Sequence, residues 1–369
     1  MFVNKSRLPH VLRPGLYSCP DQHQKELSQL FAPGWHMVGT LEDLSKNGDF
    51  LTIELLGTPI IVRNFEGEIH TFLNVCPHRH CLLTHDACGN SPTLTCQYHA
   101  WEFLKDGHTG KIPDAQSFRP MPGGPECLKK FRTEVRGPLI FVSLSANPPD
   151  LSESLGPLNI VCDEFPAARW QQASKWSYEF PANWKVVVEN TVESYHVPTV
   201  HPKTLVRFGN EDEIQHEIFD NATIMRSTIY APEAYRRIAN WLLPTLQPGC
   251  THQYNLYHGF PNVFLIRIDA MLQIMTVEPL TPTTCRLTVY VQTLRAERES
   301  WRSKLLTSGW GRLKTSVIKT VLAEDARLYP DLQKGMQSSP FQGTISVREE
   351  LVWAFQEYVQ RECGLMPTA

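Results

Sequence analysis

Residues 76–80 read CPHRH, and residues 96–99 read CQYH. Each stretch holds one cysteine and one histidine, and these four residues are Cys76, His78, Cys96 and His99. The chain leaves 17 residues between the histidine of the first stretch and the cysteine of the second. Two short loops therefore offer two thiols and two imidazoles, which are the side chains that transition metals prefer as ligands.

Two kinds of metal site use this ligand set. Structural zinc also binds two cysteines and two histidines, but zinc motifs usually pair Cys with Cys and His with His. Here each loop contributes one of each, which favours a [2Fe–2S] cluster with both thiolates on one iron and both imidazoles on the other. The remaining alternative is four unrelated core residues, and the paired pattern argues against it.

A second group of polar residues follows in residues 183–201, which read NWKVVVENTVESYHVPTVH. Glu189, Glu193 and His196 stand at positions i, i+4 and i+7, so we expect them on one face of a helix. Pro198 would end or kink that helix and let His201 turn back toward His196. Two imidazoles with one carboxylate form the ligand set of non-haem Fe(II) oxygenases. The alternative is a pair of surface or hydrogen-bonded histidines.

Together the two groups resemble the Rieske non-haem iron oxygenases, with the Rieske part near residues 34–146. The surrounding Arg79, Gly89, Asn90, Trp101 and Gly107 also match that family. Respiratory Rieske proteins carry one extra cysteine in each loop. Cys81 stands at the first of these places but Tyr98 at the second, so the resemblance implies the oxygenase type, without that disulfide.

One part of the first loop departs from the family. His80 and Cys81 stand where the family usually has small residues. The Cys-x-His spacing of the family favours His78 over His80 as the ligand.

The family takes its iron carboxylate from a C-terminal helix. Three acidic residues are candidates, Glu324, Asp325 and Asp331. Asp325 matches best, because the family follows this Asp with Gln-x-Gly, which is found here at residues 333–335. The resemblance therefore implies His196, His201 and Asp325 as ligands of a mononuclear iron.

The resemblance also marks Glu193 and Asn190 as candidate catalytic residues. In the family the position of Glu193 is commonly Asp, and it links an iron-ligand histidine to a cluster-ligand histidine of a neighbouring subunit. Glu at this place resembles the subgroup of carnitine, choline and glycine betaine monooxygenases.

Regular patterns along the chain predict an α+β protein. Short β-rich runs separated by turns predict a small all-β domain; they are residues 50–53, 60–62, 69–72 and 139–142. A second set of segments predicts helices at residues 21–31, 184–197 and 297–335, antiparallel strands within 252–295, and a last helix opened by a capping box at 346–349.

These segments predict two domains. The Rieske domain spans residues 34–146, and the Pro/Ser stretch at 145–150 marks its end. Residues 1–33 and 147–369 form a catalytic domain with an antiparallel sheet flanked by helices. Three strand segments are expected to line its pocket, residues 254–257, 260–265 and 271–274.

Composition limits the remaining possibilities. The 369 residues carry 35 Lys and Arg against 38 Asp and Glu, a net charge of −3, so no basic excess points to nucleic acid. No apolar stretch approaches the ~20 residues of a membrane span. Residues 1–18 lack the apolar core of a secretory signal, and 10 cysteines are too few for a disulfide scaffold. We therefore expect a cytoplasmic protein.

The expected function is that of a terminal oxygenase, which activates O2 at a mononuclear Fe(II) supplied with electrons by a Rieske cluster. The chain has no Gly-x-Gly-x-x-Gly motif and no second group of cysteines, so the reductase is a separate flavin or ferredoxin-type protein. The family implies a homotrimer. A small aliphatic amine or quaternary ammonium compound, hydroxylated beside nitrogen, is the first substrate class, and an aromatic or heterocyclic ring the second. A Rieske electron carrier without catalysis is a distant third.

Overall fold

The computed structural model describes residues 1–119, 127–205, 213–228, 233–247 and 252–365. The chain divides into two compact units. The small unit is Ala32–Leu151, and the large unit combines Met1–Phe31 with Ser152–Ala369.

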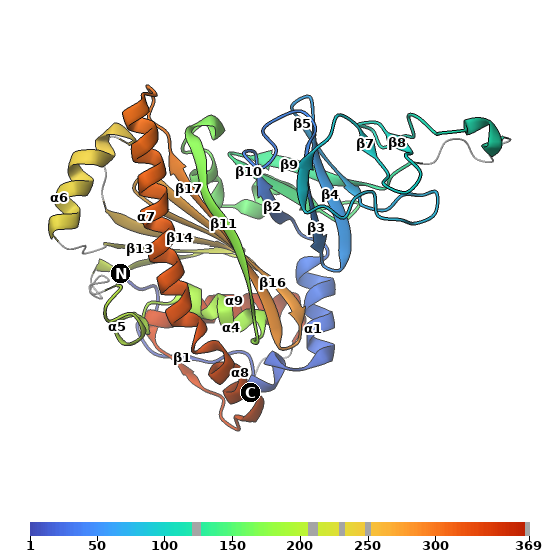
Figure 1. Ribbon diagram of the computed structural model, residues 1–369. Coiled ribbons are helices and arrows are strands. Elements are labelled where there is room, and N and C mark those ends of the chain that lie inside the picture. Colours follow the sequence, from blue (N-terminus) through green and yellow to red (C-terminus); the bar gives the residue numbers. More distant parts are fainter. Residues whose placement is uncertain (120–126, 206–212, 229–232, 248–251, 366–369) are drawn as a thin grey trace. The chain divides into compact units, whose positions relative to one another are not determined.

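A seven-stranded antiparallel sheet forms the small unit (Figure 1). In spatial order its strands are β2 (His36–Thr40), β10 (Leu139–Ser143), β9 (Lys130–Arg136), β5 (Glu68–Leu73), β4 (Thr58–Phe65), β3 (Asp49–Leu55) and β6 (Cys88–Asn90). A two-stranded sheet pairs β7 (Leu94–Thr95) with β8 (Glu102–Phe103). All four β-rich runs expected in this region are strands.

Tight turns connect the central strands of the small unit. Leu56 and Gly57 join β3 to β4 with φ of 48° and 76°, and Glu66 and Gly67 join β4 to β5 with φ of 54° and 95°. Two successive residues with positive φ match the twist of neighbouring antiparallel strands. The turns therefore fix the register of β3, β4 and β5. Strand β5 then leads into residues 74–81, the first of the two Cys/His loops.

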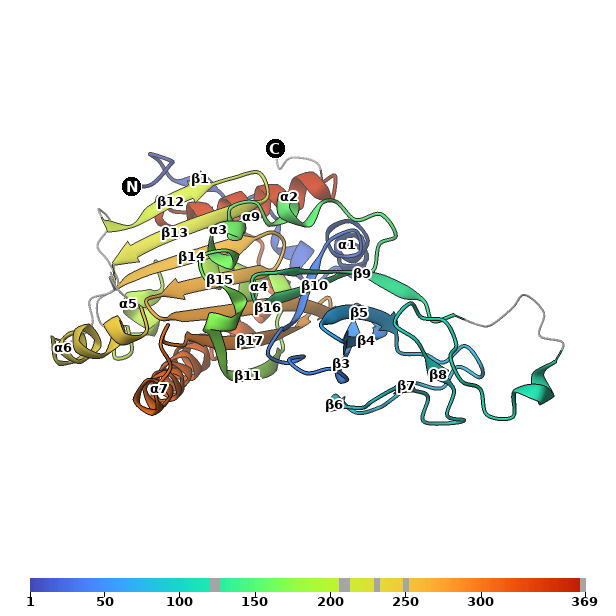
Figure 2. The same cartoon turned by 90° about the horizontal axis from the view of Figure 1, so that it is seen from above.

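The large unit is also built on a seven-stranded antiparallel sheet. In spatial order its strands are β11 (Trp170–Phe180), β17 (Thr284–Leu294), β16 (Met271–Thr281), β15 (Val263–Ile268), β14 (Gln253–Gly259), β13 (Ala222–Thr228) and β12 (Gln215–Ile218) (Figure 2). Alternating side chains give this sheet two buried faces. The strands predicted within residues 252–295 are therefore confirmed, although Phe260 and Pro261, expected in a strand, lie in the turn before β15.

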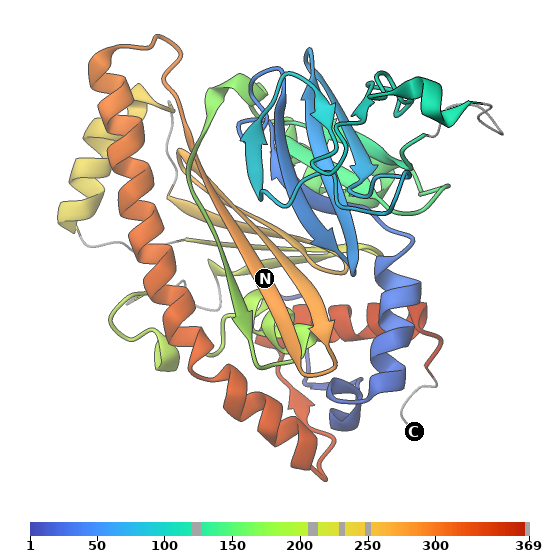
Figure 3. The ribbon, with the colours of Figure 1, turned by 45° about the vertical axis from the view of Figure 1, so that its right-hand side comes forward.

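Helices cover both faces of the large sheet. They are α2 (Leu151–Leu155), α3 (Leu158–Cys162), α4 (Trp184–Val192), α5 (Val197–Val200), α6 (Glu233–Leu242), α7 (Trp301–Ala326), α8 (Tyr329–Ser338) and α9 (Glu350–Glu362). Helix α3 lies over β14 and β15 on one face. On the other face α7 packs on β11 and β17, and α4 packs on β16 and β17. Figure 3 follows α7 along its length to α8.

Capping explains where two of these helices begin. The Ser300 side chain accepts from the Ser303 N–H at the start of α7. The predicted capping box at residues 346–349 is confirmed, since Glu349 accepts from the Ser346 N–H at 3.0 Å and from its hydroxyl at 2.8 Å. These bonds satisfy backbone groups that the first helical turn leaves free.

The N-terminal segment belongs to the large unit. It contains β1 (Leu8–Pro9), paired with β18 (Thr344–Ile345), and α1 (Pro20–Glu26), which continues as a π-turn through Phe31. The helix predicted at residues 21–31 is present, but its buried face includes Gln22, His23 and Glu26 as well as apolar residues. No helix in the described ranges is long and apolar enough to cross a bilayer.

Candidate metal centres

Helix α4 ends before the residues expected on its last turns. Asn183 caps its start by accepting from the Lys185 N–H at 2.9 Å, and Glu193 is already extended, with φ −118° and ψ 164°. The expected single helical face of Glu189, Glu193 and His196 is therefore wrong. A polar turn replaces the helix, in which Glu193 Oε2 accepts from the backbone N–H groups of Tyr195 and His196 and Glu193 Oε1 bonds His196 Nδ1.

Two further details of this segment differ from expectation. Pro198 does not end a helix but lies in the first turn of α5, where a missing N–H costs nothing. Glu189 lies among buried residues and accepts hydrogen bonds from the Tyr17 hydroxyl and, at 3.0 Å, from Gln356 Nε2. It is thus part of the packing between α4 and the N-terminal segment.

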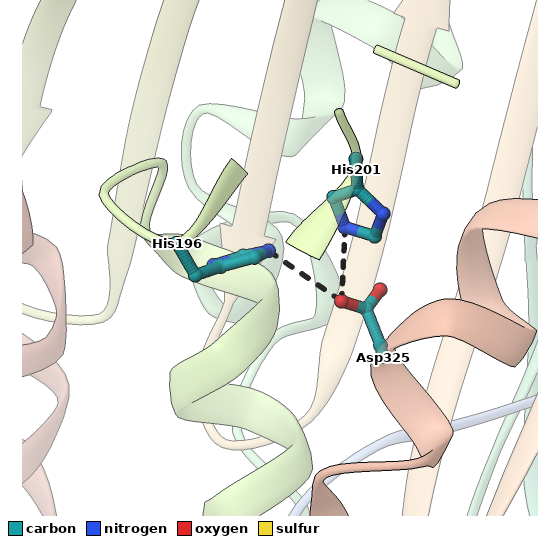
Figure 4. Close-up of side chains that lie close together, drawn as sticks. All are labelled: His196, His201 and Asp325. Atoms are coloured by element: carbon teal, nitrogen blue, oxygen red, sulfur yellow. Dashed lines mark ion pairs between the residues drawn. The ribbon is translucent and has the colours of Figure 1, made fainter. Parts of the chain in front are cut away.

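His196, His201 and Asp325 converge although 123 residues separate the second histidine from the aspartate (Figure 4). Asp325 Oδ1 lies 3.5 Å from His196 Nε2 and 3.0 Å from His201 Nε2. In the part of the chain that the structure describes, these are the only three His, Cys, Asp or Glu residues whose ligand atoms lie within 4.8 Å of one another. Asp331 is exposed on α8.

This group of three fits a metal ion. Asp325 is 5% exposed, and its Oδ1 is buried without any contact that meets hydrogen-bond geometry. Three donor atoms therefore point at one place without satisfying one another. A cation bound there would offset the free-energy cost of burying a carboxylate oxygen that makes no hydrogen bond.

Two other carboxylates hold the far sides of the imidazole rings. His196 Nδ1 hydrogen-bonds Glu193, and His201 Nδ1 hydrogen-bonds Glu324 Oε2 at 2.7 Å. The Thr204 hydroxyl donates to the second Glu324 oxygen at 2.7 Å. With Nδ1 occupied in both rings, both Nε2 atoms are left for a metal, as is usual for metal-binding histidines.

The same carboxylates change the protonation of the iron-free site. Burial lowers the pKa of His196, but the nearby Asp325 and Glu193 carboxylates outweigh it and bring the pKa to about 9. His201 follows the same pattern with Asp325 and Glu324, and its pKa is raised. Burial raises the pKa of Asp325, but its two histidine neighbours lower it overall.

Asn190 binds a tyrosine near this group. Its side chain hydrogen-bonds the hydroxyl of Tyr329, which is buried at the start of α8 near Asp325. Sequence reasoning missed Tyr329 and Thr204, and it considered Glu324 only as an alternative ligand. Adjacent acids on a helix, such as Glu324 and Asp325, point about 100° apart, so one can face the metal while the other binds a ligand's ring.

The two loops of the small unit repeat one backbone pattern. The Cys76 N–H donates to the Cys81 carbonyl at 2.8 Å and the His80 N–H to the Cys76 carbonyl at 3.0 Å. In the second loop the Cys96 N–H donates to the Trp101 carbonyl at 2.9 Å, and the Ala100 N–H donates to the Cys96 carbonyl at 3.0 Å. His80 and Ala100 occupy equivalent positions with φ of 59° and 56°. This conformation favours glycine, which explains why small residues are usual there.

The side chains of the loops form a thiol pair and an imidazole pair. The Cys76 and Cys96 thiols are both 2% exposed, and burial followed by the contact with Cys96 raises the pKa of Cys76 to about 11. The His78 and His99 rings lie 4.7 Å apart, and His78 stacks on Trp101 at 4.7 Å. His80 is exposed.

This arrangement fits a cluster better than one ion. A single tetrahedral zinc draws four donors within about 4 Å of each other, and the four atoms here are not gathered so closely. His78 Nδ1 is buried without a partner, as expected for an atom that binds a metal. Separate sulfur and nitrogen pairs match the two irons of a [2Fe–2S] cluster.

Comparison with known proteins identifies the family. The family described as ring hydroxylating alpha subunit (catalytic domain) matches residues 167–364, and the Rieske [2Fe-2S] domain matches residues 34–132. The chain belongs to the ring-hydroxylating alpha subunits. These are Rieske non-haem iron oxygenases, so the expected family, fold class and pair of cofactors, a Rieske cluster and a mononuclear iron, are confirmed.

Curated relatives of this alpha subunit include two kinds of oxygenase. The glycine betaine monooxygenase oxygenase subunit of Chromohalobacter salexigens is 30% identical over 208 residues, which cover 55% of this chain and 46% of that protein. The anthranilate 1,2-dioxygenase large subunit of Acinetobacter baylyi is 31% identical over 194 residues, or 50% of this chain and 41% of that protein. The alignments thus span less than half of each relative.

Solved structures extend the likeness over nearly the whole alpha subunit. A quaternary ammonium Rieske monooxygenase in complex with L-carnitine has a TM-score of 0.76 at 19% identity, covering 97% of this chain and 95% of that one. Another structure of such an enzyme, described as giving insights into inter-subunit electron transfer, has a TM-score of 0.76 at 19% identity, covering 96% and 95%. At this identity the likeness shows the fold.

Proposed function

We propose that this chain is the terminal oxygenase component of a Rieske oxygenase system. The observation that carries the proposal is the convergence of His196, His201 and Asp325 within 4.8 Å, in a chain that also contains a Rieske domain. Three protein ligands leave coordination positions open. A protein that only carries electrons would need no such second site.

Each group of residues has a distinct task in this proposal. Cys76, His78, Cys96 and His99 would hold the cluster, and His196, His201 and Asp325 the iron. When bound, the two centres supply single electrons and a place for O2 activation. Glu193 and Glu324 accept the Nδ1 protons of the two iron histidines and so fix ring orientation and tautomer.

Partners follow from the same proposal. A separate reductase supplies the electrons, and the chain works as a homotrimer in which Glu193 links His196 to His99 of a neighbouring subunit. A relative described as using inter-subunit electron transfer supports this arrangement. That this protein works in the cytoplasm remains a prediction.

The first substrate class is a small quaternary ammonium compound or aliphatic amine, hydroxylated beside nitrogen with N–C cleavage or demethylation to follow. It is supported by the glycine betaine relative and by the carnitine-bound structure. The anthranilate dioxygenase relative supports the second class, an aromatic ring.

Iron content and O2 uptake test the proposal. The purified protein should contain about three irons per chain, and His196→Ala should remove one while the cluster signal in electron paramagnetic resonance persists. With a surrogate reductase, O2 uptake should rise with glycine betaine, carnitine, choline or a simple aromatic acid. Two irons per chain and no substrate-dependent uptake would indicate an electron carrier instead.

A further inference from the structure

A groove opens in the sheet of the small unit where β5 and β9 separate. These strands pair at two positions, of which the outer one joins Thr71 to Phe131, whereas β9 stays paired with β10 over its length. The next pair would join His70 to Arg132, but the strands have parted there. The groove has a volume of about 680 Å³ and is lined by residues 70, 129–134 and 144–146, all within the small unit.

The lining of this groove carries an excess of positive charge. Lys129, Lys130 and Arg132 are exposed, and none of them forms an ion pair with another described residue. Among the described residues of the lining, Glu134 is the single acid. Glu68, just outside the lining, is already paired with a lysine at 3.3 Å and a histidine at 3.2 Å. The groove therefore attracts negatively charged partners.

The basic side of the groove covers the core that holds the cluster cysteines. Lys130 and Arg132 share one side of β9, because alternate residues of a strand point the same way. On that side the Lys130 ammonium lies 5.9 Å from the centre of the Phe72 ring. Phe72 is fully buried and packs in the same hydrophobic core as Cys76 and Cys96. The groove and the proposed [2Fe–2S] cluster are thus separated by one layer of core side chains.

The backbone also connects the groove closely to the first Cys/His loop. The Leu73 N–H donates to the Lys129 carbonyl at 2.8 Å, and Leu73 precedes Cys76 by three residues. Three residues of chain span at most about 11 Å. A protein docked in the groove would therefore bring its own redox centre close to the cluster.

The histidine side of the cluster has another task in the proposed function. There His99 faces a neighbouring subunit, to which the electron leaves. A donor protein needs a different approach to the same cluster, and the groove provides one on the side of the cysteines and of Phe72.

We propose that this groove is the docking surface for the electron-donor protein, and that Lys129, Lys130 and Arg132 select a donor with an acidic surface around its redox centre. The inference rests on the proposed function and identifies how its separate reductase is recognised. In the docked pair one electron passes from the reduced donor to the oxidised cluster. The donor is oxidised, the cluster is reduced, and no covalent bond forms or breaks.

A plant-type [2Fe–2S] ferredoxin of net negative charge is the probe. Its potential lies below that of a Rieske cluster, so it can reduce this protein. Calorimetry with the oxidised ferredoxin gives the affinity, and anaerobic stopped-flow absorbance with the reduced ferredoxin gives the rate of cluster reduction. We expect both to fall at least about 10-fold between low and high salt, because salt screens the attraction. Absence of binding, or binding that salt does not weaken, would overturn the proposal.

Variants of both signs locate the effect. Lys130→Glu and Arg132→Glu should each weaken ferredoxin binding and slow cluster reduction by about 10-fold at low salt, and Arg132→Lys should keep both near the wild-type values. Glu134→Gln should strengthen binding by about 2-fold, because it removes the groove's negative charge. Damage to the fold would not produce this gain.

Arg312→Glu is the matched control, since it changes the net charge equally at an exposed arginine on α7 of the large unit. Its affinity for ferredoxin should stay unchanged. An equal loss in Arg312→Glu and Arg132→Glu would show that net charge, not the groove, governs binding, and would contradict the proposal. Full reduction by excess dithionite shows in each variant that the cluster is intact. Because no substrate or O2 is present, failure of the proposed oxygenase activity remains a separate result.

Discussion

Two neighbouring residues on α7 face different partners. Asp325 faces both Nε2 atoms, at 3.5 and 3.0 Å, whereas Glu324 reaches His201 Nδ1 at 2.7 Å. The 100° rotation between successive helical residues makes this division possible. We therefore expect their substitutions to have different effects.

Asp325→Ala should abolish binding of the mononuclear iron, because no other described carboxylate lies within reach of both Nε2 atoms. Glu324→Gln should keep the iron but weaken its binding by about 10- to 100-fold, the usual effect of losing a carboxylate behind a ligand. Iron titration checks both, with the cluster signal as the internal control. Full iron content in Asp325→Ala would show that another acid is the iron ligand.

Glu193→Gln should keep both metal centres. Both Glu193 oxygens already bind groups of the turn, and an amide accepts on one oxygen only, so the proposed link to a neighbouring subunit's histidine would be lost. We expect electron transfer between the centres to slow by about 10- to 100-fold. Single-turnover kinetics after reduction of the cluster measure this, and an unchanged rate would contradict the role of Glu193.

His258 makes the large unit sensitive to acid. Complete burial lowers its pKa to about 3, against about 6.5 in an unfolded chain. Below pH 6.5 the unfolded chain takes up a proton that the folded one refuses, so stability falls from pH 6.5 toward pH 3. By pH 5 the loss from this group is about 2 kcal/mol.

His258→Phe should remove that part of the pH dependence while keeping the stacking on Phe264, whose ring lies 4.3 Å away. Urea unfolding at pH 7 and pH 5 provides the measurement. If both proteins lost the same stability between these pH values, His258 would not be the responsible group.

At the scale of elements, α1 and α4 are joined by a buried ion pair. Lys185 Nζ lies 2.6 Å from Glu26 Oε1, and both side chains are at most 1% exposed. Glu26 also accepts from Trp184 Nε1 at 2.7 Å and from Gln22 at 2.9 Å. The N-terminal segment is thereby fixed to the helix that leads into the Glu193 turn.

Removing either partner of this pair leaves a buried charge uncompensated. Lys185→Met or Glu26→Gln should each cost about 3–5 kcal/mol of unfolding free energy. The double variant should recover most of that loss, because two neutral side chains need no counter-charge. Chemical denaturation checks this, and strictly additive losses would show that the charges do not interact.

At the scale of the whole molecule, the proposed route between subunits predicts complementation. A Cys76→Ser chain lacks the cluster and a His196→Ala chain lacks the iron, so each alone should be inactive. Co-expressed as mixed oligomers, they should regain part of the activity, because an intact cluster can face an intact iron site on a neighbour. If the mixed oligomers were inactive, electrons would not pass between subunits, and the proposed route would be contradicted.

Local sequence was enough for much of this protein. The four Cys and His residues of the small unit lie close together in the chain, so spacing alone predicted a paired metal site. Alternation predicted strands such as β17, and the capping box at residues 346–349 predicted the start of the last helix. These features depend on neighbours within a few residues, which the sequence displays directly.

Tertiary structure decided the rest. Helical periodicity placed Glu193 and His196 on one helix, but bonds from the turn's own N–H groups to Glu193 end that helix at Val192. Which acid meets the two imidazoles depends on how α7 packs across the sheet, and no local pattern encodes it. That the Ser227 hydroxyl is buried without a hydrogen-bond partner among the described residues became recognisable only in the folded sheet, because burial and the absence of a partner are properties of the assembled core.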